Sequence, residues 1–177
     1  MCGILAILRM GHSTNKSKAL RQLELIQHRG PDSVGHYTDE NCFIGQVRLA
    51  MVGINSGFQP LYNKDRTICL VANGEIYNYK DIKQTLLETN PEYESQFQTS
   101  SDCEVIIFLY KKFGKDFMKK SNMNGMFGFV LYDIAKEIFV VARDAIGMIP
   151  LYVGTSSDGS VWYCSEFKAL EGHCTVG

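Results

Sequence analysis

Residues 128–164, GFVLYDIAKEIFVVARDAIGMIPLYVGTSSDGSVWYC, decide the fold class. Four short apolar segments follow one another in this stretch, at Gly128–Tyr132, Ile138–Ala142, Leu151–Val153 and Val161–Cys164. Short runs of β-branched and aromatic residues between turn residues are typical of β-strands. Because these segments adjoin one another and do not alternate with helices, the pattern favours a layered α+β architecture over a doubly wound parallel sheet.

Upstream of this stretch, helical and strand-like segments both occur. Ser101 and Glu104 have the spacing of a capping box ahead of an apolar run, which predicts the start of a helix. Asn73-Gly74 follows an apolar segment and predicts a turn. The polar segment Glu171–Gly177 is expected to be a tail that leads into a linker, so that the chain is a fragment of a longer protein. The predicted strands are Ile4–Leu8, Phe43–Ile54 and Thr67–Ala72, and the predicted helices are Lys16–His28, Tyr79–Glu88 and Ser101–Lys119.

The composition suits one compact domain. The chain has 177 residues, of which 45% are hydrophobic, so residues 1–177 are expected to form a single domain with a full core. The net charge of −1 gives no basic excess for nucleic acid and no charge block for a membrane surface. No apolar run approaches the ~20 residues that a membrane helix needs.

The six cysteines are expected to be free thiols. The chain is not small, its apolar N-terminal run is a poor secretory leader, and several cysteines lie inside apolar segments. A cytoplasmic protein with buried thiols is therefore predicted. No Cys-x-x-Cys pair occurs and the four histidines are scattered, which argues against a structural zinc site.

Cys2 is the first candidate for chemistry. If Met1 is removed, as is usual before a small second residue, the thiol and the α-amino group of Cys2 share one carbon framework. A nucleophile needs a nearby base, and an α-amine titrates near ~7.7–8.0, close to working pH. One residue then supplies both groups. Alternatively, Cys2 is an ordinary small apolar residue at the start of a strand.

Asn73 and Gly74 are candidates for an oxyanion hole. A turn at a strand end can present a side-chain amide and a backbone N–H together, which are the two donors that such a hole requires. Glycine there lets a substrate approach the backbone closely. The simpler interpretation is a turn and nothing more.

Two charged residues are candidates for holding the head of an amino acid. Arg48 lies within an apolar strand, where its guanidinium can bind a carboxylate through two parallel hydrogen bonds. Asp102 lies at a helix start, which favours an ionised carboxylate that can receive an ammonium group. Alternatively, Arg48 is a solvated strand residue and Asp102 only stabilises the helix dipole. Arg143 and Asp144, in a turn between strands, are expected to form an ion pair.

Motifs spread over the whole chain carry a family resemblance. They are Met1-Cys2-Gly3-Ile4, His28–Asp32, Arg48-Leu49, Gln59-Pro60-Leu61-Tyr62, Asn73–Asn78, Ser101-Asp102-Cys103-Glu104, Gly125-Met126-Phe127, Arg143-Asp144 with Gly147, and Ser165-Glu166 with Lys168-Ala169-Leu170. In this order they resemble the class II glutamine amidotransferases, which are N-terminal-nucleophile hydrolases. The Glu75–Asn78 continuation favours the asparagine synthetase branch. Met51 and Ser100 depart from the family's pattern, which puts substrate fit in question.

The resemblance implies a four-layer αββα sandwich, with two antiparallel sheets between helices. It implies hydrolysis of glutamine to glutamate and ammonia through a γ-glutamyl thioester. The implied site residues are Cys2 as nucleophile with its own α-amine as base, Asn73 and Gly74 as the oxyanion hole, Arg48 for the α-carboxylate, Asp102 and Glu75 for the α-ammonium, and the segment Arg48, Leu49, Ala50, Met51 and Val52 as the pocket wall.

The resemblance also implies partners. A complete asparagine synthetase has a second domain that activates aspartate with ATP. This chain has no Gly-rich phosphate loop, so no cofactor or metal is expected here, and ATP and Mg²⁺ are expected only in the absent synthetase domain. Glutamine is the expected substrate, the C-terminal synthetase domain the expected partner, and a homodimer of the full-length protein is allowed. Two rivals stay open, namely the glutaminase domain of another class II amidotransferase and a non-catalytic glutamine-binding regulatory module.

Overall fold

Two antiparallel sheets form the centre of the molecule. The structure, a computed structural model, describes residues 1–10, 15–49 and 56–176. One sheet has the strand order β10-β8-β9-β1-β3-β2, and the other has the order β4-β5-β6-β7. The strands are β1 (Gly3–Leu8), β2 (Ser33–Thr38), β3 (Cys42–Arg48), β4 (Leu61–Tyr62), β5 (Ile68–Ile76), β6 (Gly125–Asp133), β7 (Ile138–Arg143), β8 (Tyr152–Ser156), β9 (Val161–Cys164) and β10 (Cys174–Val176).

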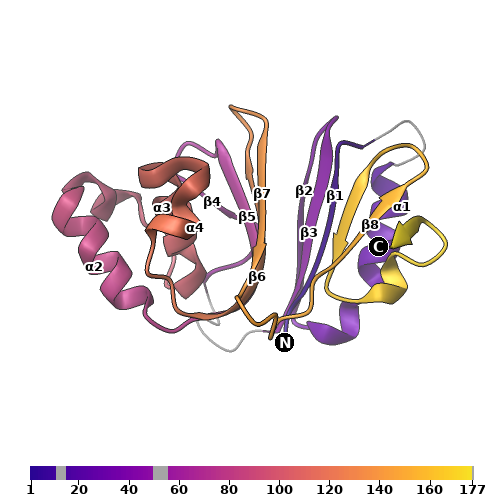
Figure 1. The fold of residues 1–177 in the computed structure, drawn as a ribbon, viewed down its shortest axis with the longest axis horizontal. Coiled ribbons are helices and arrows are strands. Elements are labelled where there is room, and N and C mark those ends of the chain that lie inside the picture. The colour runs from indigo at the N-terminus through magenta and orange to yellow at the C-terminus, as the bar shows by residue number, and fades with distance from the viewer. Residues whose placement is uncertain (11–14, 50–55, 177) are drawn as a thin grey trace.

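Helices cover the outer faces of both sheets. Helix α1 (Lys16–Glu24) packs on the six-stranded sheet, and α2 (Tyr79–Thr89), α3 (Val105–Phe113) and α4 (Phe117–Lys120) pack on the four-stranded sheet. Figure 1 shows the resulting order of layers, from α2–α4 through the two sheets to α1. The predicted four-layer αββα sandwich is confirmed.

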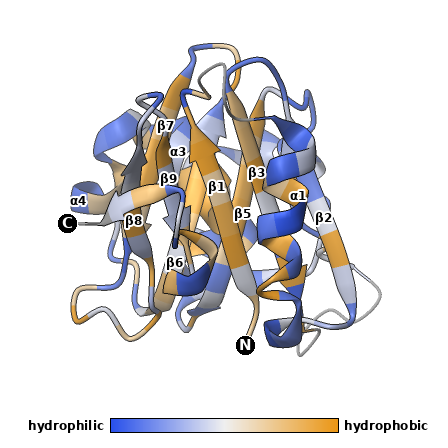
Figure 2. Cartoon of the chain, turned by 90° about the vertical axis from the view of Figure 1, so that its right-hand side faces the viewer, coloured by the Kyte–Doolittle hydropathy of each residue, from blue (hydrophilic) through white to orange (hydrophobic). Residues whose placement is uncertain are grey.

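Strand β1 is apolar at every position because it is buried on both faces. Leu5 and Ile7 belong to the core beneath α1, whereas Ile4, Ala6 and Leu8 belong to the core between the two sheets. A strand that is buried on both faces needs apolar side chains at every position. Figure 2 shows β1 as a hydrophobic strand beside α1, most of whose residues are hydrophilic.

Helix α1 begins with a side-chain cap. The Asn15 side chain accepts a hydrogen bond from the Lys18 N–H at 2.9 Å, which satisfies one of the free amides of the first turn. Ala19 and Leu23 are buried against the sheet. The helix is shorter than the predicted Lys16–His28, because it ends at Glu24 and a 3₁₀ segment, Gln27–Arg29, follows.

The turn predicted at Asn73-Gly74 is wrong. Both residues lie inside β5, where Asn73 pairs with Gly128 and Gly74 with Phe127 of β6. Gly74 has a φ of +128°, and a Cβ at this position would lie 2.0 Å from the Met126 carbonyl oxygen. Glycine is therefore required here by the close approach of β6 to β5.

The single helix predicted at Ser101–Lys119 is also wrong. Gly114, with a φ of +65°, separates α3 from the segment that leads into α4. The predicted capping box is replaced by another arrangement. The Glu104 carboxylate accepts the N–H groups of Gln98 at 2.7 Å and Thr99 at 2.9 Å, and so fixes the segment that precedes Asp102.

Three further boundaries differ from the prediction. Strand β2 was not expected from its mixed sequence SVGHYT. The predicted strand Phe43–Ile54 ends at Arg48, and its last residues lie outside the described part of the chain. The predicted tail Glu171–Gly177 contains β10, which pairs with β8 at the edge of the sheet.

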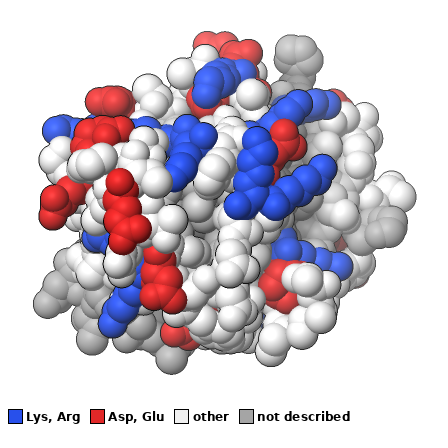
Figure 3. Space-filling view, turned by 60° about the vertical axis from the view of Figure 1, so that its left-hand side comes forward, with Lys and Arg blue, Asp and Glu red and all other residues white. Residues whose placement is uncertain are grey.

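The surface and the cysteines agree with the composition. Figure 3 shows Lys and Arg side chains interspersed with Asp and Glu over the side of the molecule that carries α2. All six cysteines are free, as predicted, and Cys42, Cys69, Cys103 and Cys164 are buried. Among the described residues, none of the helices is long and apolar enough to span a membrane.

Candidate active site

The candidate site lies at one end of the apolar core between the two sheets, near the N-terminus, which Figure 1 shows between the ends of the two sheets. Every second side chain of a strand faces the same side. A polar residue two positions beyond a series of inward-facing apolar residues therefore also points into the space between the sheets. Cys2 continues the series Ile4-Ala6-Leu8 next to β1, Arg48 continues the series Cys42-Ile44 of β3, and Asn73 continues the series Cys69-Val71 of β5. The periodicity that builds the core therefore also aims these three side chains at one place.

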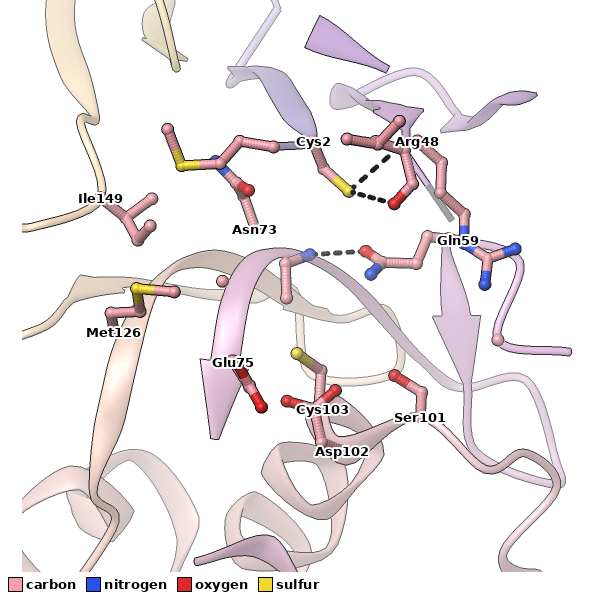
Figure 4. Close-up of a pocket in the computed structure, with 15 residues that line it drawn as sticks. Cys2, Arg48, Gln59, Asn73, Glu75, Ser101, Asp102, Cys103, Met126 and Ile149 are labelled. Carbon is pink, nitrogen blue, oxygen red and sulfur yellow. Dashed lines mark hydrogen bonds between the residues drawn. The ribbon is translucent and has the colours of Figure 1, made fainter. Parts of the chain in front are cut away.

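These residues surround a cavity of about 170 Å³. Liquid water occupies about 30 Å³ per molecule, so the cavity has room for a small organic molecule. Figure 4 shows Cys2 and Asn73 on one side of it, Glu75, Asp102 and Cys103 across from them, and Arg48 and Gln59 at one end. The lining residues are Met1, Cys2, Arg48, Leu49, Gly57, Gln59, Ala72, Asn73, Gly74, Glu75, Ser101, Asp102, Cys103, Met126 and Ile149.

The thiol of Cys2 is held by the backbone of Leu49. The Leu49 N–H donates to the Cys2 Sγ at 3.4 Å, and the thiol lies 3.6 Å from the Leu49 carbonyl oxygen that it donates to. These two contacts hold the sulfur at the edge of the cavity. Cys103, the other thiol of the cavity, is fully buried, and this burial, followed by the charge of Asp102, raises its pKa well above the ordinary value. Cys103 is therefore an inert thiol, and Cys2 is the candidate nucleophile.

Asn73 presents an unused hydrogen-bond donor to this cavity. Its side chain is 2% exposed, and within the described part of the chain its Nδ2 has no hydrogen-bond partner. A buried donor without a partner costs about 1–3 kcal/mol, so such a group calls for an explanation. A ligand oxygen in the cavity would supply the acceptor.

The backbone of β5 places a second donor beside Asn73. The Phe127 N–H and carbonyl of β6 both bond with Asp144, so the pair Gly74–Phe127 leaves the Gly74 N–H on the other edge of β5. On that edge the Ala72 N–H donates to the Gln59 side chain and the Ile76 N–H donates to Asp102, each at 2.6 Å. The Gly74 N–H lies between these two groups, along the wall of the cavity.

Opposite charges lie around the same cavity. Arg48 is 6% exposed, donates through Nη2 to the Ser56 carbonyl oxygen at 2.8 Å, and stacks with its guanidinium 5.1 Å from the centre of the Phe58 ring. Asp102 is fixed by its bond with the backbone of β5, and Glu75 is exposed at the rim. A ligand that carries both a carboxylate and an ammonium would find a partner for each.

The predicted ion pair between Arg143 and Asp144 is wrong. The Asp144 carboxylate accepts the backbone N–H groups of Met148 at 2.9 Å, Ile149 at 3.2 Å and Phe127 at 3.3 Å. Burial alone would raise the pKa of Asp144, but these hydrogen bonds outweigh it and lower the pKa below the ordinary value. The carboxylate thereby anchors the loop that brings Ile149 into the cavity wall.

Most predicted site residues come together in the structure. Cys2, Arg48, Leu49, Asn73, Gly74, Glu75 and Asp102 all line the cavity. Ala50, Met51 and Val52, predicted as part of the pocket wall, lie outside the described residues. The prediction did not give pocket roles to Gly57, Gln59, Ser101, Cys103, Met126 and Ile149, which also line the cavity. In the part of the chain that the structure describes, no group of three or more His, Cys, Asp or Glu side chains is arranged to hold a metal ion.

An αββα framework with a cysteine at the head of an inter-sheet strand is the plan of an N-terminal-nucleophile amidotransferase. The comparison with protein families agrees with this class, since residues 1–177 match the glutamine amidotransferase domain throughout. The chain belongs to the glutamine amidotransferase domain family.

Similar proteins narrow the position within the family. The chain is 47% identical over 177 residues to glutamine-hydrolyzing asparagine synthetase 3 of Arabidopsis thaliana, and 46% identical over 177 residues to the glutamine-hydrolyzing asparagine synthetase of Zea mays. Each match covers 98% of this chain and 29% of the relative, so the chain spans less than a third of the length of these curated relatives.

Solved structures show the same fold. The glutamine phosphoribosylpyrophosphate amidotransferase of B. subtilis, solved with ADP and GMP, has a TM-score of 0.78 at 25% identity, over 98% of this chain and 44% of that one. The allosteric regulatory enzyme of purine biosynthesis has a TM-score of 0.77 at 26% identity. The predicted resemblance to class II amidotransferases, and to asparagine synthetases among them, is confirmed.

Proposed function

We propose that this chain hydrolyses glutamine to glutamate and ammonia, with Cys2 as the nucleophile. The proposal rests on the buried Nδ2 of Asn73, which has no hydrogen-bond partner among the described residues and faces the same cavity as the Cys2 thiol. An amide donor that has no acceptor before the reaction is suited to stabilise an oxyanion that exists only during the reaction.

The chemistry proceeds in two halves. Once Met1 is removed, the α-amine of Cys2 takes the thiol proton, and the thiolate attacks the carboxamide carbon of glutamine. The resulting oxyanion accepts hydrogen bonds from the Asn73 Nδ2 and the Gly74 N–H. The α-ammonium returns its proton to the leaving nitrogen, so that ammonia departs and a γ-glutamyl thioester remains. Water, deprotonated by the same amine, then attacks the thioester and releases glutamate and the free thiol.

The opposite charges of the cavity account for selection of an α-amino acid. Arg48 pairs with the α-carboxylate of glutamine, and Asp102 with Glu75 receives the α-ammonium. The bond from the backbone of β5 to Asp102 and the stacking of Phe58 on Arg48 restrict both partners before substrate arrives. Such preorganisation reduces the entropy that binding would otherwise cost.

The ammonia acceptor is proposed from the relatives. Identities of 44–47% with proteins named asparagine synthetase, against 25–26% with the two solved structures, favour asparagine formation from aspartate in a further domain of a longer protein. We place ATP and Mg²⁺ in that domain and no cofactor in this chain. A cytoplasmic location and a homodimer of the full-length protein remain predictions.

A turnover assay for glutamate and ammonia tests the hydrolysis. Cys2→Ala should abolish turnover and leave the melting temperature near that of the parent, because the half-buried thiol contributes little packing. Cys174→Ala is the matched control, since Cys174 is also a half-buried free thiol but lies in β10 away from the cavity. Full turnover in Cys2→Ala would refute the assignment.

A second measurement isolates the α-amine. Protein that retains Met1, or carries an uncleaved N-terminal tag, has an amide in place of the base and should lose turnover while keeping the thiol. Intact mass identifies the N-terminus of each preparation. Normal turnover in a tagged protein would rule out the terminal amine as the base.

A further inference from the structure

A network of charged side chains lies behind Cys2, on the side away from the cavity. The Arg29 Nε donates to the Cys2 carbonyl oxygen at 2.9 Å, and the Arg29 Nη1 donates to the Glu166 Oε1 at 3.1 Å. The same carboxylate contacts the His28 Nε2 at 2.8 Å and the Lys168 Nζ at 3.1 Å. One carboxylate therefore faces three nitrogen-bearing side chains, and the nearest of them to Cys2 is a permanent cation.

The position of Arg29 is fixed by its surroundings. Its side chain is 12% exposed, and its Nη2 is buried without a hydrogen-bond partner among the described residues. Glu166 is held in turn, because the neighbouring Ser165 accepts the Ile4 N–H with its side chain at 2.9 Å and donates its own N–H to the Ile4 carbonyl at 3.0 Å. Burial alone would raise the pKa of Glu166, but hydrogen bonds from Lys168, Arg29 and His28 outweigh it and lower the pKa.

Building on the proposed hydrolysis, we propose that Arg29 is a positioning residue, held by Glu166, that fixes the Cys2 carbonyl and keeps the α-amine of Cys2 in its neutral, proton-accepting form. A hydrogen bond to the carbonyl restricts rotation of the residue that carries both nucleophile and base. A positive charge beside an amine disfavours its protonated state. Glu166 lies beyond Arg29 and is shared with His28 and Lys168, so its opposing effect at the amine is weaker.

The expected size of this effect follows from the spacing. Bond lengths and the 2.9 Å contact put the guanidinium roughly 6 Å from the nitrogen of Cys2. A unit charge at roughly 6 Å, with an effective dielectric constant between about 20 and 40, lowers the pKa of an amine by about one to two units. The other charged or titratable groups around Cys2 are Arg48, Glu75, Asp102 and Cys103 on the cavity side and His28, Glu166 and Lys168 behind it.

NMR titration of the Cys2 amine tests the proposal without any turnover. In a Cys2→Ser background with ¹³C-labelled serine, the Cα shift of residue 2 follows the amine alone, since the thiol is absent. Arg29→Gln should raise the amine pKa by about one to two units. Arg29→Lys retains the charge and should keep the titration within about half a unit.

Kinetics on the Cys2 protein give the second readout. The acid limb of the kcat/KM profile for glutamine should move up in Arg29→Gln by the same amount as the amine titration. Arg29→Lys should lower kcat about tenfold or more with little shift of the limb, because its ammonium cannot bond the Cys2 carbonyl and Glu166 as a planar fork does. A role in packing alone would not move either titration.

Two control variants distinguish the effect of Arg29 on the amine pKa from the effects of its neighbours. Lys168→Gln removes a positive charge from the outer side of Glu166, and His28→Gln removes the titratable ring of the network. Both should leave the amine titration within about 0.3 units. A shift in His28→Gln as large as that in Arg29→Gln would overturn the proposal.

The remaining outcomes are also decisive. An amine titration unmoved in folded Arg29→Gln would overturn the proposal. If that variant does not fold because Glu166 loses its partner, the double variant Arg29→Gln/Glu166→Gln removes both charges, and should still raise the amine pKa by about half as much. No glutamine turnover in the wild-type chain would refute the proposed function alone, and the NMR titration would still decide the role of Arg29.

Discussion

Asn73→Ala should lower activity and leave stability nearly unchanged. Most substitutions of a buried polar residue lose hydrogen bonds and destabilise the fold. The Nδ2 of Asn73 has no partner to lose within the described chain, and its side chain borders an existing cavity. The two effects of the substitution, on catalysis and on folding, can therefore be separated.

The magnitudes follow from that environment. Relief of the unpaired donor contributes about 1–3 kcal/mol of stability, and the lost contacts of three side-chain atoms offset much of it. The net change should lie within about 1 kcal/mol, or roughly 4 °C in Tm for a domain of this size. Loss of one oxyanion donor should reduce kcat by about 10²–10³-fold, which corresponds to about 2.7–4 kcal/mol, with a much smaller change in KM.

Asn63 offers the matched control. It is 4% exposed, but its Nδ2 donates to the Thr67 hydroxyl at 2.9 Å and its Oδ1 accepts the Ile68 N–H at 2.8 Å. Asn63→Ala should therefore cost about 2–3 kcal/mol, roughly 4–12 °C in Tm, and leave kcat of the folded enzyme unchanged. Thermal melts and steady-state kinetics give the Tm and the kcat of each variant. A kcat near the parent value in Asn73→Ala, or a loss of stability as large as that in Asn63→Ala, would refute the assignment of Asn73.

Three further predictions concern the same site. Arg48→Ala and Asp102→Asn should each raise KM for glutamine by orders of magnitude, since an unpaired substrate charge costs ~2–5 kcal/mol, and an unchanged KM in both would exclude the proposed amino-acid pocket. Gly74→Ala should fail to fold or lose several kcal/mol in denaturant unfolding, roughly 3–5, because its Cβ would lie 2.0 Å from the Met126 carbonyl oxygen. The lowered pKa of Asp144 contributes stability that is present above the ordinary carboxyl range and is lost as pH falls through the folded value. Asp144→Asn should therefore flatten the decline in stability between about pH 5 and pH 2, and an equally steep decline would contradict this.

Periodicity alone predicted much of the fold. The uninterrupted apolar runs of β1 and β6 identify strands that are covered on both faces, because only such strands need this sequence. Strands β7 and β9 are only partly buried, and their β-branched and aromatic residues identified them. Strand β2 was missed since its side chains are half-buried and polar at an edge of the sheet. The break at Gly114 was missed because a single glycine at this spacing is also tolerated inside a helix.

The site was predicted largely through the family resemblance, and its geometry explains why. Asn73 and Gly74 were expected in a turn. Instead they continue strand β5, because they pair with Gly128 and Phe127 of β6, which lie more than fifty positions away in the chain. No local pattern contains such information. Ile149 was missed for a different reason: the Asp144 carboxylate, which was expected to pair with Arg143, instead accepts the Ile149 N–H and turns the loop toward the cavity.

The inward-facing series of the strands also explain where catalysis takes place. Between the sheets they are apolar apart from Gln46, whose side chain donates to the Ala72 carbonyl oxygen, and at one end the same series reach Cys2, Arg48 and Asn73. A buried guanidinium and an amide without a partner in the described part of the chain both oppose folding, so they are tolerated only where the continuous apolar core beside them supplies the stability. Substrate would reverse part of that cost by accepting a hydrogen bond from the Asn73 amide and by placing a carboxylate beside the Arg48 guanidinium. Glutamine should accordingly raise the Tm of the Cys2→Ala protein, which binds substrate without consuming it, and should raise it far less when Arg48→Ala is added.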